Sequence, residues 1–110
     1  MSLADVLRAA AAKVRRGWTQ GEYARNAAGL PVVPASPRAV CWCAGGAIAV
    51  CAGSWSHRAD VADVLVEDVG SVVAWNDATG RTAEEVATQM ERTAARLDDR
   101  SAWTIAKVSK

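Results

Sequence analysis

The sequence predicts an all-α fold, a compact bundle of four to five short helices around an apolar central helix rich in Cys and Gly. Three observations support this prediction. Apolar residues recur at helical spacing near both ends of the chain. Glycine follows most of these segments, at the position where helices commonly end. The longest apolar run, residues 39–52, is apolar on nearly every side, as in a helix that other helices surround.

The first predicted helix spans residues 3–16. Ser2 is its expected N-cap, and Asp5 stands three residues later, in a capping-box arrangement. Gly17 is expected to end the helix. Its apolar face is formed by Leu3, Val6, Leu7, Ala10, Ala11 and Val14.

A short helix over residues 21–28 is expected next, ended by Gly29. Residues 30–37 are predicted to form a loop. Their three prolines lie within seven residues, and proline is excluded from a helix interior because it lacks an N–H group and clashes with the preceding turn.

The central helix is predicted to begin with Ser36 as its N-cap and Pro37 in its first turn, where a missing N–H group has no cost. Gly53 is expected to end it. Gly45 and Gly46 each cost about 1 kcal/mol relative to Ala inside a helix. We therefore expect another backbone or an indole ring to pack closely against them.

A further helix is predicted over residues 58–69, ended by Gly70. Residues 71–75 are short enough to form a strand. Residues 103–108 could also form a strand, and the two segments could pair.

The last predicted helix runs over residues 83–97. Thr82 is its expected N-cap and Glu85 the capping-box partner. Glu84 adds negative charge to the first turn, where it complements the helix dipole. Residues 98–101 are expected to end the helix. Its buried stripe is predicted to be Val86, Met90, Ala94 and Leu97.

The composition narrows the function classes. The 13 basic and 12 acidic residues give a net charge of +1, which argues against nucleic-acid binding through phosphate contacts. The apolar run over residues 39–52 is too short to span a bilayer, so no membrane contact is expected. An odd number of cysteines, three, in a chain without an export signal predicts reduced thiols and a cytoplasmic location.

Neither a metal site nor a catalytic site is expected. Cys41 and Cys43 would point in divergent directions on a helix, and Cys43 and Cys51 would lie too far apart to share one zinc ion. Cys51 and His57, the sole histidine, could meet as a nucleophile and base, but no third group to orient them is evident. We therefore predict a protein that is not an enzyme and needs no cofactor.

Four short blocks stand out in the chain. They are "WTQG" at residues 18–21, "ARNAAG" at residues 24–29, "CAGGA" at residues 43–47 and "AWNDATGRTAEEV" at residues 74–86. Together they resemble the pattern of a family of small helical domains of unknown function from bacterial and phage genomes.

The resemblance covers residues 3–95. It implies one helical domain, predicted here as residues 1–97, and a phage or mobile-element setting. It implies no chemistry. Asn26 stands where the family often has Asp, which puts any role for a carboxylate there in doubt. Residues 98–110 lie outside the pattern and are expected to be a C-terminal tail, in which the role of Trp103 is left open.

The first and last blocks hold the candidate ligand-binding residues. The functional interpretation is that six side chains line one polar cleft that grips a small polar ligand or a peptide. The structural interpretation is that the same groups satisfy one another and the backbone, with Gly80 supplying a turn. The six are Trp18, Gln20, Trp75, Asn76, Asp77 and Arg81.

Two functions follow as the main hypotheses, and an enzyme with Cys43 or Cys51 exposed beside His57 is a third. The first is a non-catalytic binding protein of phage or mobile-element type that acts by protein–protein contact, with inhibition of a host defence complex as one such role. It rests on analogy, on the small size and on the lack of a catalytic constellation. The alternative is a binder of a small polar ligand or peptide that uses the cleft described above. The partner and the oligomeric state are left open.

Overall fold

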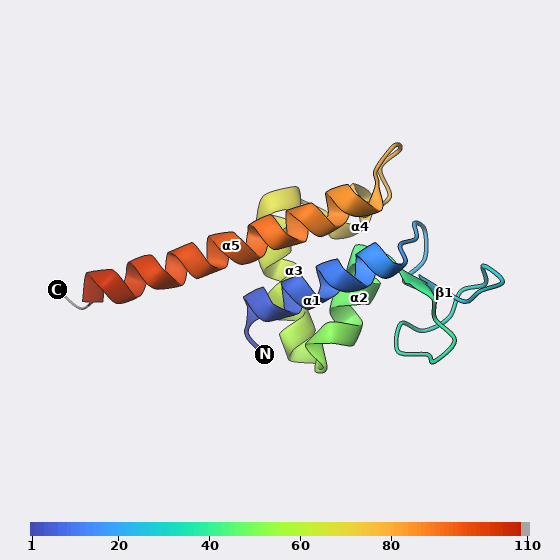
Figure 1. The fold of residues 1–110 in the computed structure, drawn as a ribbon, viewed down its shortest axis with the longest axis horizontal. Coiled ribbons are helices and arrows are strands. Elements are labelled where there is room, and N and C mark those ends of the chain that lie inside the picture. Colours follow the sequence, from blue (N-terminus) through green and yellow to red (C-terminus); the bar gives the residue numbers. More distant parts are fainter. Residues whose placement is uncertain (109–110) are drawn as a thin grey trace.

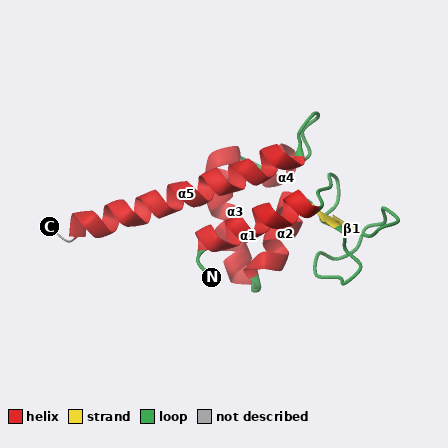
Figure 2. Cartoon of the chain, viewed as in Figure 1, coloured by secondary structure: helices red, strands yellow, loops and turns green. Residues whose placement is uncertain are grey.

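A computed structural model describes the backbone of residues 1–108 and the side chains of residues 1–100 (Figure 1). Within this part of the chain the fold consists of five helices and one two-stranded sheet, which confirms the all-α prediction (Figure 2). In chain order the elements are α1 (Leu3–Arg16), β1 (Ala24–Arg25), β2 (Cys41–Trp42), α2 (Ala44–Ala52), α3 (Trp55–Val69), α4 (Val72–Asn76) and α5 (Ala83–Val108).

Capping boxes begin the two best-predicted helices, as expected. At the start of α1, the Ser2 hydroxyl accepts from the backbone N–H of Asp5 at 3.1 Å, and the Asp5 carboxylate accepts from the backbone N–H of Ser2. At the start of α5, Thr82 and Glu85 exchange the same two bonds, at 3.2 and 3.0 Å. These side chains satisfy N–H groups that the first turn of a helix leaves without partners.

The hydrophobic core lies mainly between α1 and α5, which run side by side in Figure 1. Helix α2 packs against α1 and α3, and α3 contacts both α1 and α5. The predicted face of α1 is buried apart from Leu3, and the predicted stripe of α5 is buried apart from Leu97, which packs against the core from its edge. The fully buried side chains of this core include Val6, Leu7, Val14, Ile48, Val61, Leu65, Val86 and Met90.

The central helix begins seven residues later than predicted, at Ala44 and not at Pro37. The Ser36 hydroxyl instead accepts from the backbone N–H of Arg38, two residues on, and so closes a turn. Cys43 is the actual N-cap, and its sulfur accepts from the backbone N–H of Gly46 at 3.3 Å. The end of α2 at Gly53, in a left-handed conformation, is as predicted.

The predicted helix over residues 21–28 is wrong. Strand β1 in this segment pairs antiparallel with β2, with Ala24 opposite Trp42 and Arg25 opposite Cys41. Gly29 therefore ends a turn and not a helix, while residues 30–37 form the predicted loop. The backbone oxygens of Tyr23 and Arg25 accept from the N–H groups of Cys43 and Val40, at 3.1 and 2.9 Å, and not from a following helical turn, so tertiary pairing outweighs local propensity.

The expected close approach at the paired glycines of α2 is present, and its source is Tyr23. A Cβ atom on Gly46 would lie 2.0 Å from the backbone oxygen of Tyr23. A Cβ atom on Gly45 would lie 3.3 Å from the Tyr23 ring. The segment before β1 thus lies directly on the first turn of α2, which is possible because these two helix positions carry no side chain.

Three further segments differ from the sequence prediction in their bounds or in their type of secondary structure. Helix α3 begins at Trp55, capped by Ser54, and ends at Gly70 as predicted. Residues 71–75 contribute to the helix α4 and not to a strand, because the Ser71 hydroxyl caps the backbone N–H of Ala74. Residues 103–108 are helical too, so the predicted strand pair does not form.

Helix α5 does not end at residues 98–101. It continues to Val108, and its C-terminal half extends beyond the other helices in Figure 1. No Gly or Pro follows Leu97 in the sequence to stop it. Ion pairs from Arg8 to Asp98 and from Arg100 to Glu67 also hold this part of α5 against α1 and α3. The side chain of Trp103 lies outside the described residues.

Candidate functional site

Asn76 connects the first and last sequence blocks. Its side-chain oxygen accepts from the indole N–H of Trp18 at 2.8 Å and from the backbone N–H of Ala44 at 2.9 Å. Its amide nitrogen donates to the backbone oxygen of Thr19 at 3.2 Å and to the Asp77 carboxylate at 2.9 Å. The Asn76 side chain is buried and uses both its donors and two acceptor positions, so no bonding capacity is evident for a ligand.

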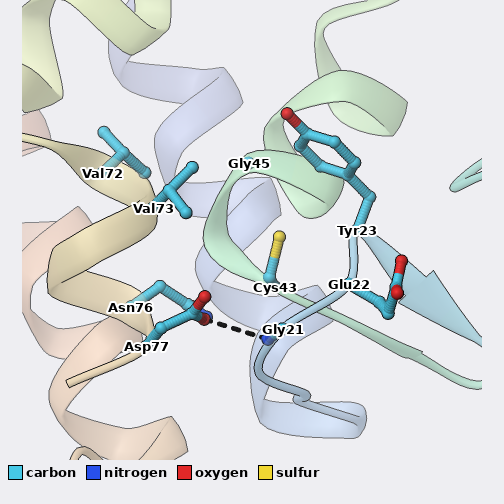
Figure 3. Close-up of a pocket in the computed structure, with 9 residues that line it drawn as sticks. All are labelled: Gly21, Glu22, Tyr23, Cys43, Gly45, Val72, Val73, Asn76 and Asp77. Atoms are coloured by element: carbon cyan, nitrogen blue, oxygen red, sulfur yellow. Dashed lines mark hydrogen bonds between the residues drawn. The ribbon is translucent and has the colours of Figure 1, made fainter.

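Gln20 and Asp77 complete this junction. The Gln20 amide donates to the backbone oxygens of Asn76 and Ala78, at 3.0 and 3.1 Å. One carboxylate oxygen of Asp77 accepts from the backbone N–H of Gly21 at 3.1 Å, a bond that Figure 3 shows as a dashed line. Together these bonds fasten the segment after α1 to the end of α4.

Arg81 and Trp75 lie on another side of the same loop. The Arg81 Nε atom donates to the backbone oxygen of Trp75 at 2.9 Å, and its guanidinium stands 5.5 Å from the centre of the Trp75 ring. Arg81 also pairs loosely with Glu85, at 3.6 Å. Gly80 has a φ of 81°, which agrees with the predicted turn.

The six predicted residues therefore do not surround one cavity. Asn76 and Asp77 reach a pocket formed with α2, whereas Trp75 and Arg81 line a separate, polar depression along α5. Neither hollow is lined by Trp18 or Gln20. The ligand-binding role of these six residues remains a prediction. A ligand could meet Asn76 and Asp77 in the pocket, or Trp75 and Arg81 in the depression along α5, but not all six residues at once.

The pocket lies between α2, α4 and the segment that precedes β1 (Figure 3). Its volume is about 150 Å³, which is the size of a cavity that holds one benzene ring. The apolar wall comprises Tyr23, Cys43, Gly45, Val72 and Val73. The remaining lining residues are Gly21, Glu22, Asn76 and Asp77.

An exposed aromatic cluster adjoins this pocket. The Arg58 guanidinium lies 5.0 Å from the centre of the Trp55 ring and 5.6 Å from the centre of the Tyr23 ring. Trp55 is 78% exposed, Val73 57% and Tyr23 48%, so large apolar groups meet solvent on one side of the molecule. We call these four residues, together with the pocket, the pocket face.

The sequence prediction identified Asn76 and Asp77 of the pocket but missed the exposed cluster of Trp55, Arg58 and Tyr23. Trp55 and Arg58 stand three residues apart in α3, a spacing that brings two side chains to one side of a helix. The sequence prediction placed the start of this helix at residue 58 and so left Trp55 outside it. With Ser54 as the N-cap, the spacing would have predicted that Trp55 and Arg58 share one side of the helix. No sequence signal indicated that Tyr23 would lie beside them, because a tertiary contact places it there.

All three cysteines are free thiols, of which Cys43 is buried and Cys41 and Cys51 are half-buried. Burial raises the pKa of the Cys43 and Cys51 thiols, so both are protonated at neutral pH. In the described residues, no group of three or more His, Cys, Asp and Glu side chains lies close enough to hold a metal ion. The Nε2 atom of His57 is buried without a hydrogen-bond partner there.

The basic residues at the end of α1 point to different neighbours. Arg15 forms ion pairs with Glu84 and Glu91 of α5, at 2.8 and 2.7 Å. The ammonium group of Lys13 lies 3.9 Å from the centre of the Trp42 ring. Arg15 and Lys13 thus hold the end of α1 against α5 and against Trp42 of β2.

Within the described part of the chain, no helix is both long enough and apolar enough to cross a membrane.

Comparison with known proteins places the chain in one family. A family model described as a family of unknown function (DUF6197) matches residues 1–96. No curated protein and no solved structure matches the chain.

Proposed function

Since the chain belongs to the DUF6197 family of unknown function, we propose its role from its own surface. It is a small, non-catalytic binding protein that acts by protein–protein contact, and the pocket face is its contact surface. The observation that carries this proposal is the cluster of Trp55, Arg58 and Tyr23 beside an apolar pocket.

The residue types support a protein partner. Trp, Tyr and Arg are the residues most enriched among those that dominate protein–protein binding energy. Single exposed apolar side chains are common, but a contiguous group of them around a pocket is typical of a contact surface. Trp55 is the most exposed of the large hydrophobic residues in the described part of the chain. Covering its ring would remove a large apolar area from water.

The chemistry of the thiols supports a non-catalytic role. A cysteine nucleophile needs a thiolate, which a lowered pKa provides. Burial changes the pKa of Cys43 and Cys51 in the opposite direction. The Cys43 sulfur is also committed to its role as the N-cap of α2.

The finer parts of the proposal rest on the sequence alone. The cytoplasmic location rests on the cysteines, and the resemblance supports a protein of phage or mobile-element type, with inhibition of a host defence complex as one such role. The alternative is a small polar ligand or peptide bound by the first and last sequence blocks. Its support is that Asn76 and Asp77 form one end of the pocket, so a peptide on the pocket face would meet these two residues.

Site-specific photo-crosslinking tests the contact surface. A photoreactive amino acid replaces Val73 on the pocket face or, as the matched control, Val66, an exposed valine on α3 that does not line the pocket. In lysate of the organism that encodes the chain, we expect a discrete protein adduct from position 73 and none from position 66. The same adducts at both positions, or none at either, would count against the proposal.

A further inference from the structure

Arg58 is held in place but has no polar partner. Its guanidinium lies over the rings of Trp55 and Tyr23. The ion pairs between described residues involve Arg8, Arg15, Arg81, Arg96 and Arg100, and none joins the guanidinium of Arg58 to a carboxylate. Arg15 and Arg96, in contrast, each bind two carboxylates. Arg16, Arg38 and Arg92 also form no side-chain bond to a described residue, but no described aromatic ring stacks on them. A guanidinium group has five N–H donors in a planar fork that matches a carboxylate, and stacking on aromatic rings fixes the plane of that fork.

The pocket beside Arg58 is apolar in its middle, with Asp77 at its far end and Glu22 on the same side as Tyr23 (Figure 3). Figure 3 shows Tyr23 at one end, Asp77 at the other, and Cys43 and Gly45 between them. The two charged residues that line the pocket, Glu22 and Asp77, are both acidic. A ligand rich in phosphate groups would be repelled there, whereas an uncharged side chain fits the middle and one anionic group fits Arg58.

We propose that the pocket face binds a peptide segment of a partner protein that carries an aliphatic side chain next to an Asp or Glu. The aliphatic side chain enters the pocket against Val72 and Val73. The acidic side chain forms a bidentate ion pair with Arg58, on the Tyr23 side of the pocket. This inference rests on the proposed function and adds the chemistry of the partner to it.

The size and charge of the pocket face both support this occupant. A volume of about 150 Å³ accommodates one side chain and not a folded surface. The guanidinium stands above the Tyr23 ring, and that ring also forms one wall of the pocket. One short segment can therefore reach both features, and the ion pair would form beside apolar surface, where it is less screened by solvent.

A peptide selection tests this chemistry directly. Random peptides displayed with a blocked C-terminus are selected on the immobilised full chain and, in parallel, on the Arg58→Gln, Arg58→Glu and Arg92→Gln variants. Arg92 is an exposed arginine of α5 and serves as the matched control. A second library with free C-termini shows whether a terminal carboxylate replaces the acidic side chain. Thermal unfolding of each variant verifies that it folds.

The inference predicts that the full chain and Arg92→Gln enrich peptides with Asp or Glu next to Leu, Ile, Val or Met. Arg58→Gln should bind these peptides about 10-fold more weakly, the usual effect of losing a hydrogen-bonded charge pair. Arg58→Glu should shift the selection toward Lys and Arg. Conservative replacement by Arg58→Lys should restore only part of the affinity, because an ammonium group cannot form the bidentate pair.

The other outcomes separate the two proposals. Apolar enrichment without an acidic residue, unaffected by Arg58→Gln, would overturn the inference and leave the proposed function standing. The inference would also be overturned if the chain selected basic peptides or bound only peptides with a free C-terminus. Preferential binding of phosphate-bearing peptides, tested as a separate arm, would overturn it too. No enrichment above an unrelated helical protein, together with no crosslinked adduct at position 73, would overturn the proposed function itself.

Discussion

The indole N–H of Trp18 donates to the side-chain oxygen of Asn76 across 2.8 Å, although 58 residues separate them in the chain. This bond joins the "WTQG" block to the "AWNDATGRTAEEV" block. Gln20 and Asp77 strengthen the junction with bonds of their own. The two most conspicuous blocks of the sequence are therefore bonded to each other, and we call this junction of Trp18, Gln20, Asn76 and Asp77 the clasp. Asn76 and Asp77 of the clasp form one end of the pocket.

The clasp predicts a large loss of stability for Asn76→Ala. The substitution leaves the indole N–H of Trp18 and the backbone N–H of Ala44 without their acceptor, and at least the second is buried. We expect the free energy of unfolding to fall by about 3 kcal/mol, measured by urea denaturation. As a control, Asn26→Ala, in an exposed turn, should cost about 1 kcal/mol or less. Equal losses for the two variants would contradict the clasp.

The neighbouring glycines of α2 predict opposite responses to alanine. Gly46→Ala would place a Cβ atom 2.0 Å from the Tyr23 backbone oxygen, which cannot move without displacing β1, so we expect severe destabilisation. Gly45→Ala meets only the half-exposed Tyr23 ring, at 3.3 Å. Its unfolding free energy should be unchanged or higher by up to about 1 kcal/mol, owing to helix propensity. Similar melting temperatures for the two variants would refute this packing.

The sequence was sufficient to predict elements whose signals are local. Ser2 with Asp5, and Thr82 with Glu85, mark helix starts because the capping side chains bond within one turn. The start of α2 could not be predicted in this way. Cys43 is an unusual N-cap, so its residue type does not indicate a helix start. Strands β1 and β2 have two residues each, which is too short for the alternation of apolar and polar residues that predicts a strand.

The sequence was less informative about the site. It singled out Asn76 and Asp77, which do line the pocket, because polar residues stood together beside a tryptophan. It did not indicate that Trp55, Arg58 and Tyr23 would cluster. The stacking of Arg58 on Tyr23 depends on how α3 packs against the segment before β1. The order of residues within either segment does not predict this packing.

The pH dependence of stability should include a contribution from Asp68. A hydrogen bond from the Thr93 hydroxyl and the nearby Arg96 guanidinium hold the pKa of Asp68 below its ordinary value. Because the folded pKa is lowered, the stabilisation is present above about pH 4 and is lost as the pH falls through the folded pKa. Asp68→Asn should therefore lower the unfolding free energy at pH 7.

The measurement is urea denaturation of both proteins between pH 7 and about pH 3. The difference between wild type and Asp68→Asn should shrink as the pH falls. A constant difference over this range would show that the charge on Asp68 contributes nothing. Glu67→Gln, at an exposed carboxylate that pairs with the same arginine, is the matched control and should show a smaller difference.

The course of α5 predicts the effect of truncation. Described ion pairs involve Asp98 and Arg100, while the helix beyond them extends past the other helices (Figure 1). A chain ending at residue 100 should fold and lose about 1 kcal/mol or less. Ending it at residue 92 would remove Ala94, which is fully buried, and should unfold the domain. Circular dichroism during thermal unfolding distinguishes these results, and an unfolded chain after the first truncation would contradict the expected boundary.

The central claim is that the pocket face is the contact surface, and a comparison of two substitutions in calorimetric titration tests it most directly. Val73→Asp introduces a charge on the pocket face, and Val66→Asp introduces the same charge elsewhere on the molecule. With the partner identified by crosslinking or an enriched peptide, Val73→Asp should weaken binding about 10-fold or more, and Val66→Asp should leave it unchanged. Equal affinities of the two folded variants would contradict the claim.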